Sequence, residues 1–166
     1  LLGNPVLRKT CAPVRDLAAE QTRSAITDLR DTLEDFRQKR GFGRGIAAPQ
    51  IGLPTRILFI DFEHTGPLIN PRITGRSRRT FLLWDDCFSF PDILVKVERH
   101  YQVTVRFTDE AGRRRSLRAE GGLSELLQHE IDHLDGILAI DRAVDSKHII
   151  LRSEFERLTK TLAGTL

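Results

Sequence analysis

The chain has 166 residues, of which 40% are hydrophobic and 30% charged, with a formal net charge of +3. This composition is typical of one folded domain and excludes a disordered chain, while no apolar run approaches the roughly 20 residues that cross a bilayer. The N-terminus lacks a signal-peptide pattern, and two cysteines, Cys11 and Cys87, are too few for a disulfide scaffold. We therefore expect a cytoplasmic protein without membrane contact.

Periodicity predicts the elements in chain order. A first long helix is predicted over Asp16–Lys39, because apolar residues recur there at helical spacing, and Gly41 ends it. β-branched and aromatic runs then predict strands over residues 56–61, 68–70, 82–84, 93–99, 102–108 and 114–119. Two more helices are predicted, one between Gly122 and Gly136 and one over Asp145–Leu162. Consecutive strands with helices at both ends predict an α+β fold, with mostly antiparallel sheets around a central helix in one domain over residues 1–166.

The most informative stretch is Gln-His-Glu-Ile-Asp-His at residues 128–133. On a helix, His129 and His133 lie about one turn apart on one face, so both imidazoles can hold one metal ion. Glu130 beside them is a candidate proton carrier. The alternative is a pair of surface histidines on an acidic helix. A catalytic site of the zinc type needs a third protein ligand, and Cys87 is the best candidate, although it could equally be a packed residue.

A glycine-rich segment follows the first predicted helix, at residues 43–50. It lacks the Lys-Ser/Thr ending of a phosphate loop, and it follows a helix rather than the strand that a dinucleotide fingerprint requires. Gly43 and Gly45 suit the close approach of a backbone or a ligand, and the amide of Gln50 can stabilise a developing oxyanion. The alternative is a tight connection between a helix and a strand.

Together, the order and spacing of three segments resemble the peptide deformylase family. That family carries Gly-x-Gly-Leu-Ala-Ala-x-Gln, Glu-Gly-Cys-Leu-Ser and Gln-His-Glu-x-Asp-His-Leu, which correspond here to residues 43–50, 85–89 and 128–134. The resemblance covers almost the whole chain and includes a strand at residues 4–8. It implies a metallo-hydrolase that removes the N-formyl group from the first residue, formyl-methionine, of newly made peptides.

The resemblance also implies roles for the site residues. The metal ligands would be Cys87, His129 and His133. They would hold one divalent ion, with ferrous iron expected first and zinc, nickel or cobalt as alternatives. The metal would acidify a water that attacks the formyl carbon, and Glu130 would take up the proton and return it to the leaving amine. Gln50 and the backbone N–H of Phe88 would hold the formyl oxygen, and the substrate backbone would pair beside Gly45 as an added strand.

The substrate-facing positions depart from the family pattern. The resemblance implies that the substrate contacts Gly43, Arg44, Gly45, Asp85, Asp86, Gly122, Glu125 and Leu126. Asp85 and Asp86 replace Glu and Gly, while Arg44, Gly122 and Glu125 stand where apolar residues are expected. Arg44 and Glu125 either pair across the pocket, or line a wet or polar pocket, or extend into solvent. The alternative function is therefore a deformylase-like amidase of a dedicated pathway, which acts on an N-formylated residue other than Met with a polar side chain.

Other classes of function explain less of the chain. A metal-binding protein without turnover has no need of Glu130, and a metalloprotease would take a downstream third ligand such as His148 rather than Cys87. Arginines cluster at residues 76–79 and 113–115, but no aromatic residues are interleaved with them. We therefore expect no DNA partner, and a transient contact with the ribosome or RNA stays open.

Overall fold

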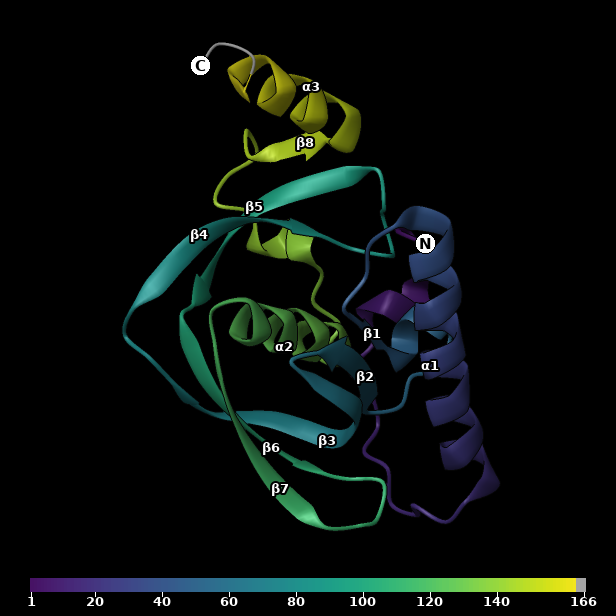
Figure 1. Cartoon of the computed structure of the whole chain (residues 1–166). Coiled ribbons are helices and arrows are strands. Elements are labelled where there is room, and N and C mark those ends of the chain that lie inside the picture. Colours follow the sequence, from purple (N-terminus) through teal and green to yellow (C-terminus); the bar gives the residue numbers. More distant parts are fainter. Residues whose placement is uncertain (164–166) are drawn as a thin grey trace.

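In the computed structural model, which describes residues 1–163, the helix α2 (Gly121–Leu134) lies between two antiparallel sheets (Figure 1). The larger sheet has the order β1-β2-β3-β6-β7, made of β1 (Gly45–Ala47), β2 (Ile57–Phe62), β3 (His64–Arg76), β6 (Gln102–Thr108) and β7 (Arg114–Glu120). The smaller has the order β4-β5-β8, made of β4 (Thr80–Asp86), β5 (Ile93–His100) and β8 (Ile149–Leu151). The predicted α+β class with a central helix is confirmed.

The main core forms between α2 and the larger sheet. Alternate residues of β6, Val103 and Val105, are fully buried against apolar residues of α2 such as Leu127 and Leu134. Every residue of α2 from Leu123 to Leu134 is buried, including its polar ones. A helix that is covered all round can therefore present histidines and carboxylates in a dry interior, where they need partners.

A second core joins α1 (Glu20–Arg40) to β1 and β2. Leu29 and Leu33 of the helix are buried there beside Ile46 and Ile57. The helix ends as predicted at Gly41, which takes the left-handed conformation (φ 77°) that glycine adopts without strain. The chain then reverses directly into β1, so the end of α1 positions the glycine-rich segment.

Two predicted boundaries at the N-terminal end are wrong. The long helix begins at Glu20 rather than Asp16, because the Asp16 carboxylate accepts a hydrogen bond from the amide of Ala18 and forms a turn instead. The segment at residues 4–8 is not a strand. Its residues Pro5–Arg8 form a 3-10 helix (η1), capped by the Asn4 side chain, which accepts from the amide of Val6.

The C-terminal prediction is also partly wrong. A single helix over Asp145–Leu162 was expected, but residues 149–151 form β8, which pairs with β5, and α3 (Arg152–Ala163) begins only after it. Before β8, Asp145 accepts from the amide of Lys147 and closes a turn at the place where the single helix was expected to begin. α3 packs on the smaller sheet through Phe155, whose ring lies 5.6 Å from that of Trp84. None of the helices within residues 1–163 has the length and apolarity that crossing a membrane requires.

Candidate metal and substrate site

The end of β4 meets α2 to form a cluster of metal-ligating atoms. Cys87 follows β4, while His129 and His133 lie on α2, and all three side chains are buried. Nε2 of His133 lies 3.2 Å from Cys87 Sγ and 3.2 Å from His129 Nε2. The fold thus brings one sulfur and two nitrogen donor atoms within 4.8 Å of one another.

His129 is held in a defined orientation by Asp85. Its Nδ1 donates to the Asp85 carboxylate at 2.9 Å, which leaves Nε2 to face Cys87 and His133. Burial opposes protonation of His129, but the facing carboxylate outweighs burial and raises the pKa of His129 well above its ordinary value. Burial and the neighbouring His129 lower the pKa of His133, so its ring stays unprotonated. The donor atoms fit a divalent transition metal with mixed nitrogen and sulfur ligands.

A buried arginine, Arg99, also contacts the Asp85 carboxylate. Arg99 of β5 donates to Asp85 at 3.2 Å and to Asp132 of α2 at 2.5 Å, and its side chain is only 4% exposed. Asp132 also accepts from Arg142 at 2.8 Å. Burial raises the pKa of Asp85, but His129 and Arg99 outweigh burial and lower it, so this carboxylate stays ionised in the interior.

Glu130 lies in the same buried space. Its Oε2 has no hydrogen-bond partner among residues 1–163, and burial raises its pKa to about 7. A Cβ at Gly45 would lie 3.1 Å from Glu130 Oε1, so a side chain at this position would press on Glu130 where β1 passes the helix. A carboxyl group with this pKa can accept and release a proton near neutral pH.

Gln50, on the 3-10 helix η2 (Ala48–Ile51), presents its amide to the cluster. Its carbonyl oxygen accepts from the amide of Ala47 at 2.8 Å, which fixes the side chain. Its NH₂ group then points to Ser89 Oγ at 3.3 Å and to Cys87 Sγ at 3.6 Å. The Phe88 side chain turns away and stacks on Phe36, with ring centroids 3.8 Å apart.

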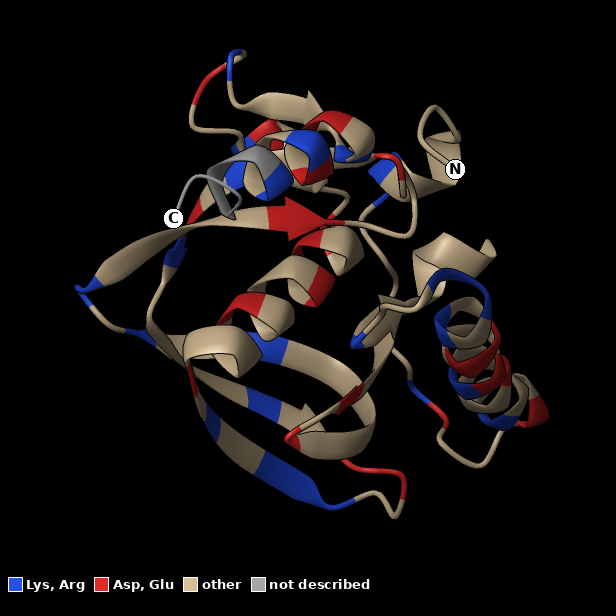
Figure 2. Cartoon of the chain, turned by 45° about the horizontal axis from the view of Figure 1, so that its top comes forward, with Lys and Arg blue, Asp and Glu red and all other residues tan. Residues whose placement is uncertain are grey.

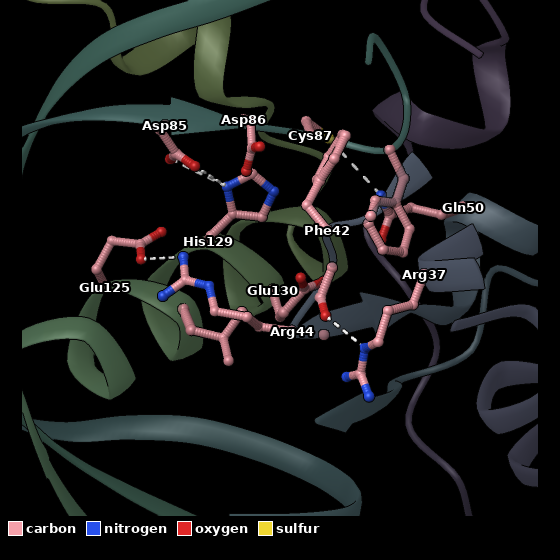
Figure 3. Close-up of a pocket in the computed structure, with 15 residues that line it drawn as sticks. Arg37, Phe42, Arg44, Gln50, Asp85, Asp86, Cys87, Glu125, His129 and Glu130 are labelled. Atoms are coloured by element: carbon pink, nitrogen blue, oxygen red, sulfur yellow. Dashed lines mark hydrogen bonds and ion pairs between the residues drawn. The ribbon is translucent and has the colours of Figure 1, made fainter. Parts of the chain in front are cut away.

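A cavity of about 320 Å³ opens beside the cluster (Figure 3). All of the residues that the sequence assigns to the site line it except His133 and Gly122. His133 is 1% exposed behind His129, and Gly122 lies beneath Arg44, which reaches toward its carbonyl at 3.4 Å. Segments that are far apart in the sequence thus converge on one cavity.

The cavity wall carries an ion pair between Arg44 and Glu125. Arg44 Nη2 lies 2.6 Å from Glu125 Oε2, and the glutamate side chain is 3% exposed against 36% for the arginine. Burial and the nearby Asp85 raise the pKa of Glu125, whereas Arg44 opposes this increase. Of the three arrangements left open by the sequence, the structure has the pair across the pocket.

Two residues that line the cavity are contacted by Arg152, from the C-terminal segment. Arg152 donates to the Asp86 carboxylate at 2.9 Å and to the carbonyl of Pro91 at 2.8 Å, and its guanidinium lies 4.2 Å from the ring centre of Phe42. The charge that Asp86 adds beside the site is therefore compensated by Arg152.

Comparison with known proteins identifies the family. The family model described as polypeptide deformylase matches residues 1–148. The chain belongs to the peptide deformylase family. The peptide deformylase of Treponema pallidum is 39% identical over 99% of this chain and 96% of its own length, and that of Rhizobium meliloti is 37% identical over 97% and 92%. As a peptide deformylase, the chain is a metallo-hydrolase that removes the N-formyl group from newly made peptides.

Solved structures agree with this assignment. A peptide deformylase from Synechococcus elongatus in complex with actinonin superimposes with a TM-score of 0.81 at 34% identity, over 89% of this chain and 78% of that one. A peptide deformylase from Legionella pneumophila gives a TM-score of 0.80 at 32% identity, over 96% and 94% of the two chains. The fold and class of enzyme expected from the sequence are confirmed.

Sequence reasoning missed three arginine contacts of the site and assigned Asp85 only to the substrate. Both oxygens of the Asp85 carboxylate are occupied by His129 and Arg99. A signal for Arg99 was available, because it continues the alternation of buried Val95 and Val97 along β5, where a charge must find a partner. No comparable signal points to Arg142 or to Arg152, whose contacts depend on the fold.

Proposed function

We propose that one divalent metal ion, ferrous iron in the first place and zinc, nickel or cobalt as alternatives, is held by Cys87, His129 and His133. The buried sulfur and nitrogen donors within 4.8 Å of one another support this ligand set. When bound, such a metal supplies the Lewis acidity that makes a water molecule nucleophilic near neutral pH. The position of His129 depends on Asp85, so Asp85 is a positioning residue rather than a substrate contact.

Glu130 is the proton carrier in this proposal. It accepts a proton as the nucleophile forms and returns it to the amine nitrogen that leaves when the formyl C–N bond breaks. The single observation that carries the assignment is its buried, unpartnered Oε2 beside the ligand cluster, considering residues 1–163. A buried carboxylate without a partner is costly to the fold, so a catalytic role accounts for its retention.

The formyl oxygen is held by the Gln50 amide and the backbone N–H of Phe88. The fixed orientation of Gln50 supports this, because a preorganised donor stabilises developing negative charge without rearrangement. The substrate backbone pairs with β1, an edge strand that has only β2 as a neighbour in the described sheet. Gly43 and Gly45 keep the cavity beside this edge free of side chains, while Leu126 adds an apolar wall.

A specific observation favours a second candidate substrate, an N-formylated residue with a polar side chain. The Arg44–Glu125 pair places charges where the first side chain of the substrate would lie beside the metal ligands. Glu125 is the buried, fixed partner, whereas Arg44 reaches in from the exposed rim. A cationic side chain could take the place of Arg44, which the thioether of Met cannot do.

The test is deformylation of a formyl-Met-Ala-Ser peptide and of matching peptides that begin with formyl-Lys or formyl-Arg. The enzyme is purified without oxygen and loaded with ferrous iron, and Glu130→Ala with equal metal content is the control. Turnover of formyl-Met that is lost in the control supports the main proposal, and faster turnover of the cationic peptides supports the second candidate. Equal activity of the control would exclude Glu130 as the proton carrier.

We also propose that residues 1–166 act as one catalytic domain, because α2 packs against both sheets. Since the substrates are newly made chains, we expect the enzyme in the cytoplasm. Contact with the ribosome stays a prediction at this point.

A further inference from the structure

Basic residues recur along neighbouring strands of the larger sheet (Figure 2), and the strand register places four arginines on the face away from α2. Arg72 of β3 is directly opposite Arg106 of β6 in the register. On β7, Arg114 and Arg118 flank the position that faces Arg106. All four are exposed, because the alternate residues of β6 face the core. Four strongly basic side chains thus share one side of three neighbouring strands.

Most of these charges lack a partner. Arg118 donates to Gln102 at 2.8 Å and pairs with Glu120. The side chains of Arg72, Arg106 and Arg114 make no hydrogen bond or ion pair with any residue of the described part of the chain. Like charges placed directly opposite each other destabilise a sheet, so the folded chain gains nothing from this arrangement. We call Arg72, Arg106 and Arg114 the arginine face.

The arginine face lines a shallow concavity of about 450 Å³. Arg56 and Arg115 line it as well, and its other described lining residues include no aspartate or glutamate. Arg56 is neutralised by Asp135, and Arg115 by Asp109. The three arginines of the face therefore supply a positive charge that no described carboxylate cancels within the concavity.

We propose that the arginine face binds the phosphate backbone of RNA. Guanidinium groups match the geometry of phosphate oxygens and can donate two parallel hydrogen bonds to them. Thr104, Thr108 and Ser116 lie between the arginines, and such short polar residues allow a backbone to approach. Phe107, the aromatic residue of β6 and β7, borders the concavity but is buried in the main core, so it offers no free ring face on which a base could stack, and we expect binding to be independent of sequence.

Two features favour RNA over other polyanions. This face of the sheet carries no large apolar side chain that could enter a bilayer, which argues against a lipid surface. The substrates are newly made peptides, and the machinery that makes them is rich in RNA. The choice of RNA over DNA rests on the deformylase function, whereas the phosphate chemistry rests on the arginine face alone.

The test is fluorescence anisotropy of a labelled RNA hairpin titrated with the intact enzyme at several salt concentrations. The variant is Arg106→Glu with Arg114→Glu. The matched control is Arg23→Glu with Arg30→Glu, two exposed positions on α1 that change the net charge equally. We expect the face variant to bind RNA at least about ten-fold more weakly, with a salt slope lower by about 0.7–0.9 for each lost phosphate contact. The control should bind within about two-fold of the parent.

Deformylation is measured on the same samples, and both variants should keep it, because neither pair lies in the cavity. Loss of activity in parent enzyme and variants alike would count against the deformylase mechanism and not against RNA binding. Equal weakening in the two variants would overturn the proposal, because net charge alone would then explain it. Absence of RNA binding at low salt, or tighter binding to phosphatidylserine vesicles or to a DNA hairpin, would overturn it as well.

Discussion

The two halves of α2 have diverged to different degrees from the pattern that the sequence resembles. The second half carries His129, Glu130 and His133 and keeps the family motif over residues 128–134 without a departure. The first half carries Gly122 and Glu125 in place of apolar residues, and Glu125 is matched by Arg44. The difference teaches that the substrate pocket can change while the chemical centre stays constant, provided that every new buried charge arrives with a partner.

The largest expected effect comes from the second half. Glu130→Gln should lower deformylation about 10²–10⁴-fold, because the amide cannot accept the proton that the reaction releases. Metal content should stay the same, since Glu130 is not among the clustered ligand atoms. Activity assays beside metal analysis by mass spectrometry check this. Loss of the metal together with activity would instead make Glu130 a ligand.

The neighbouring aspartates give the next largest contrast. Asp85→Asn should weaken metal binding about 10–100-fold, because the charged acceptor that orients His129 is lost. Asp86→Asn is the matched control, since Asp86 pairs with Arg152 instead and should leave metal affinity unchanged. Competition with a chromogenic chelator measures both affinities. Equal losses in the two variants would contradict the positioning role of Asp85.

The ion pair of the first half should govern stability rather than chemistry. Arg44→Leu should destabilise the fold by about 1–3 kcal/mol, because it leaves the buried carboxylate of Glu125 unpaired. Adding Glu125→Leu to this variant should restore most of the stability, because two apolar side chains pack together and leave no unpaired charge. Urea unfolding of the single and double variants measures the difference. A double variant as unstable as the single one would show that the pair is not coupled.

The smallest expected effect concerns the glycines that begin α2. Gly122→Ala should stabilise the enzyme by about 0.4–1 kcal/mol, because the added Cβ would lie in ordinary contact, 3.4 Å from Phe62. Gly121→Ala is the control and should destabilise it, because Gly121 has a φ of 53°, which strains any other residue. Thermal unfolding distinguishes the two. A loss of stability at Gly122 would mean that the pocket above it is already filled.

Local patterns explain which parts the sequence could predict. The strand over residues 102–108 was predicted with its observed bounds, because inward and outward residues alternate and a turn follows. The pair His129 and His133 was placed by helical spacing alone. β3 is far longer than predicted, since Gly66 and Pro67 conceal a strand that pairing on both sides stabilises. β8 was read as helix, because only its pairing with β5 distinguishes the two.

Arg152 has a consequence for inhibitor design. It lies beyond residues 1–148, the part of the chain that matches the family model, yet it contacts Asp86 and Phe42, which line the catalytic cavity. A compound that binds only the metal ligands and Gln50 contacts residues that belong to the family motifs. A compound extended toward Phe42 and Arg152 would also contact a residue beyond the part that the family model matches, and selectivity for this enzyme should be sought there.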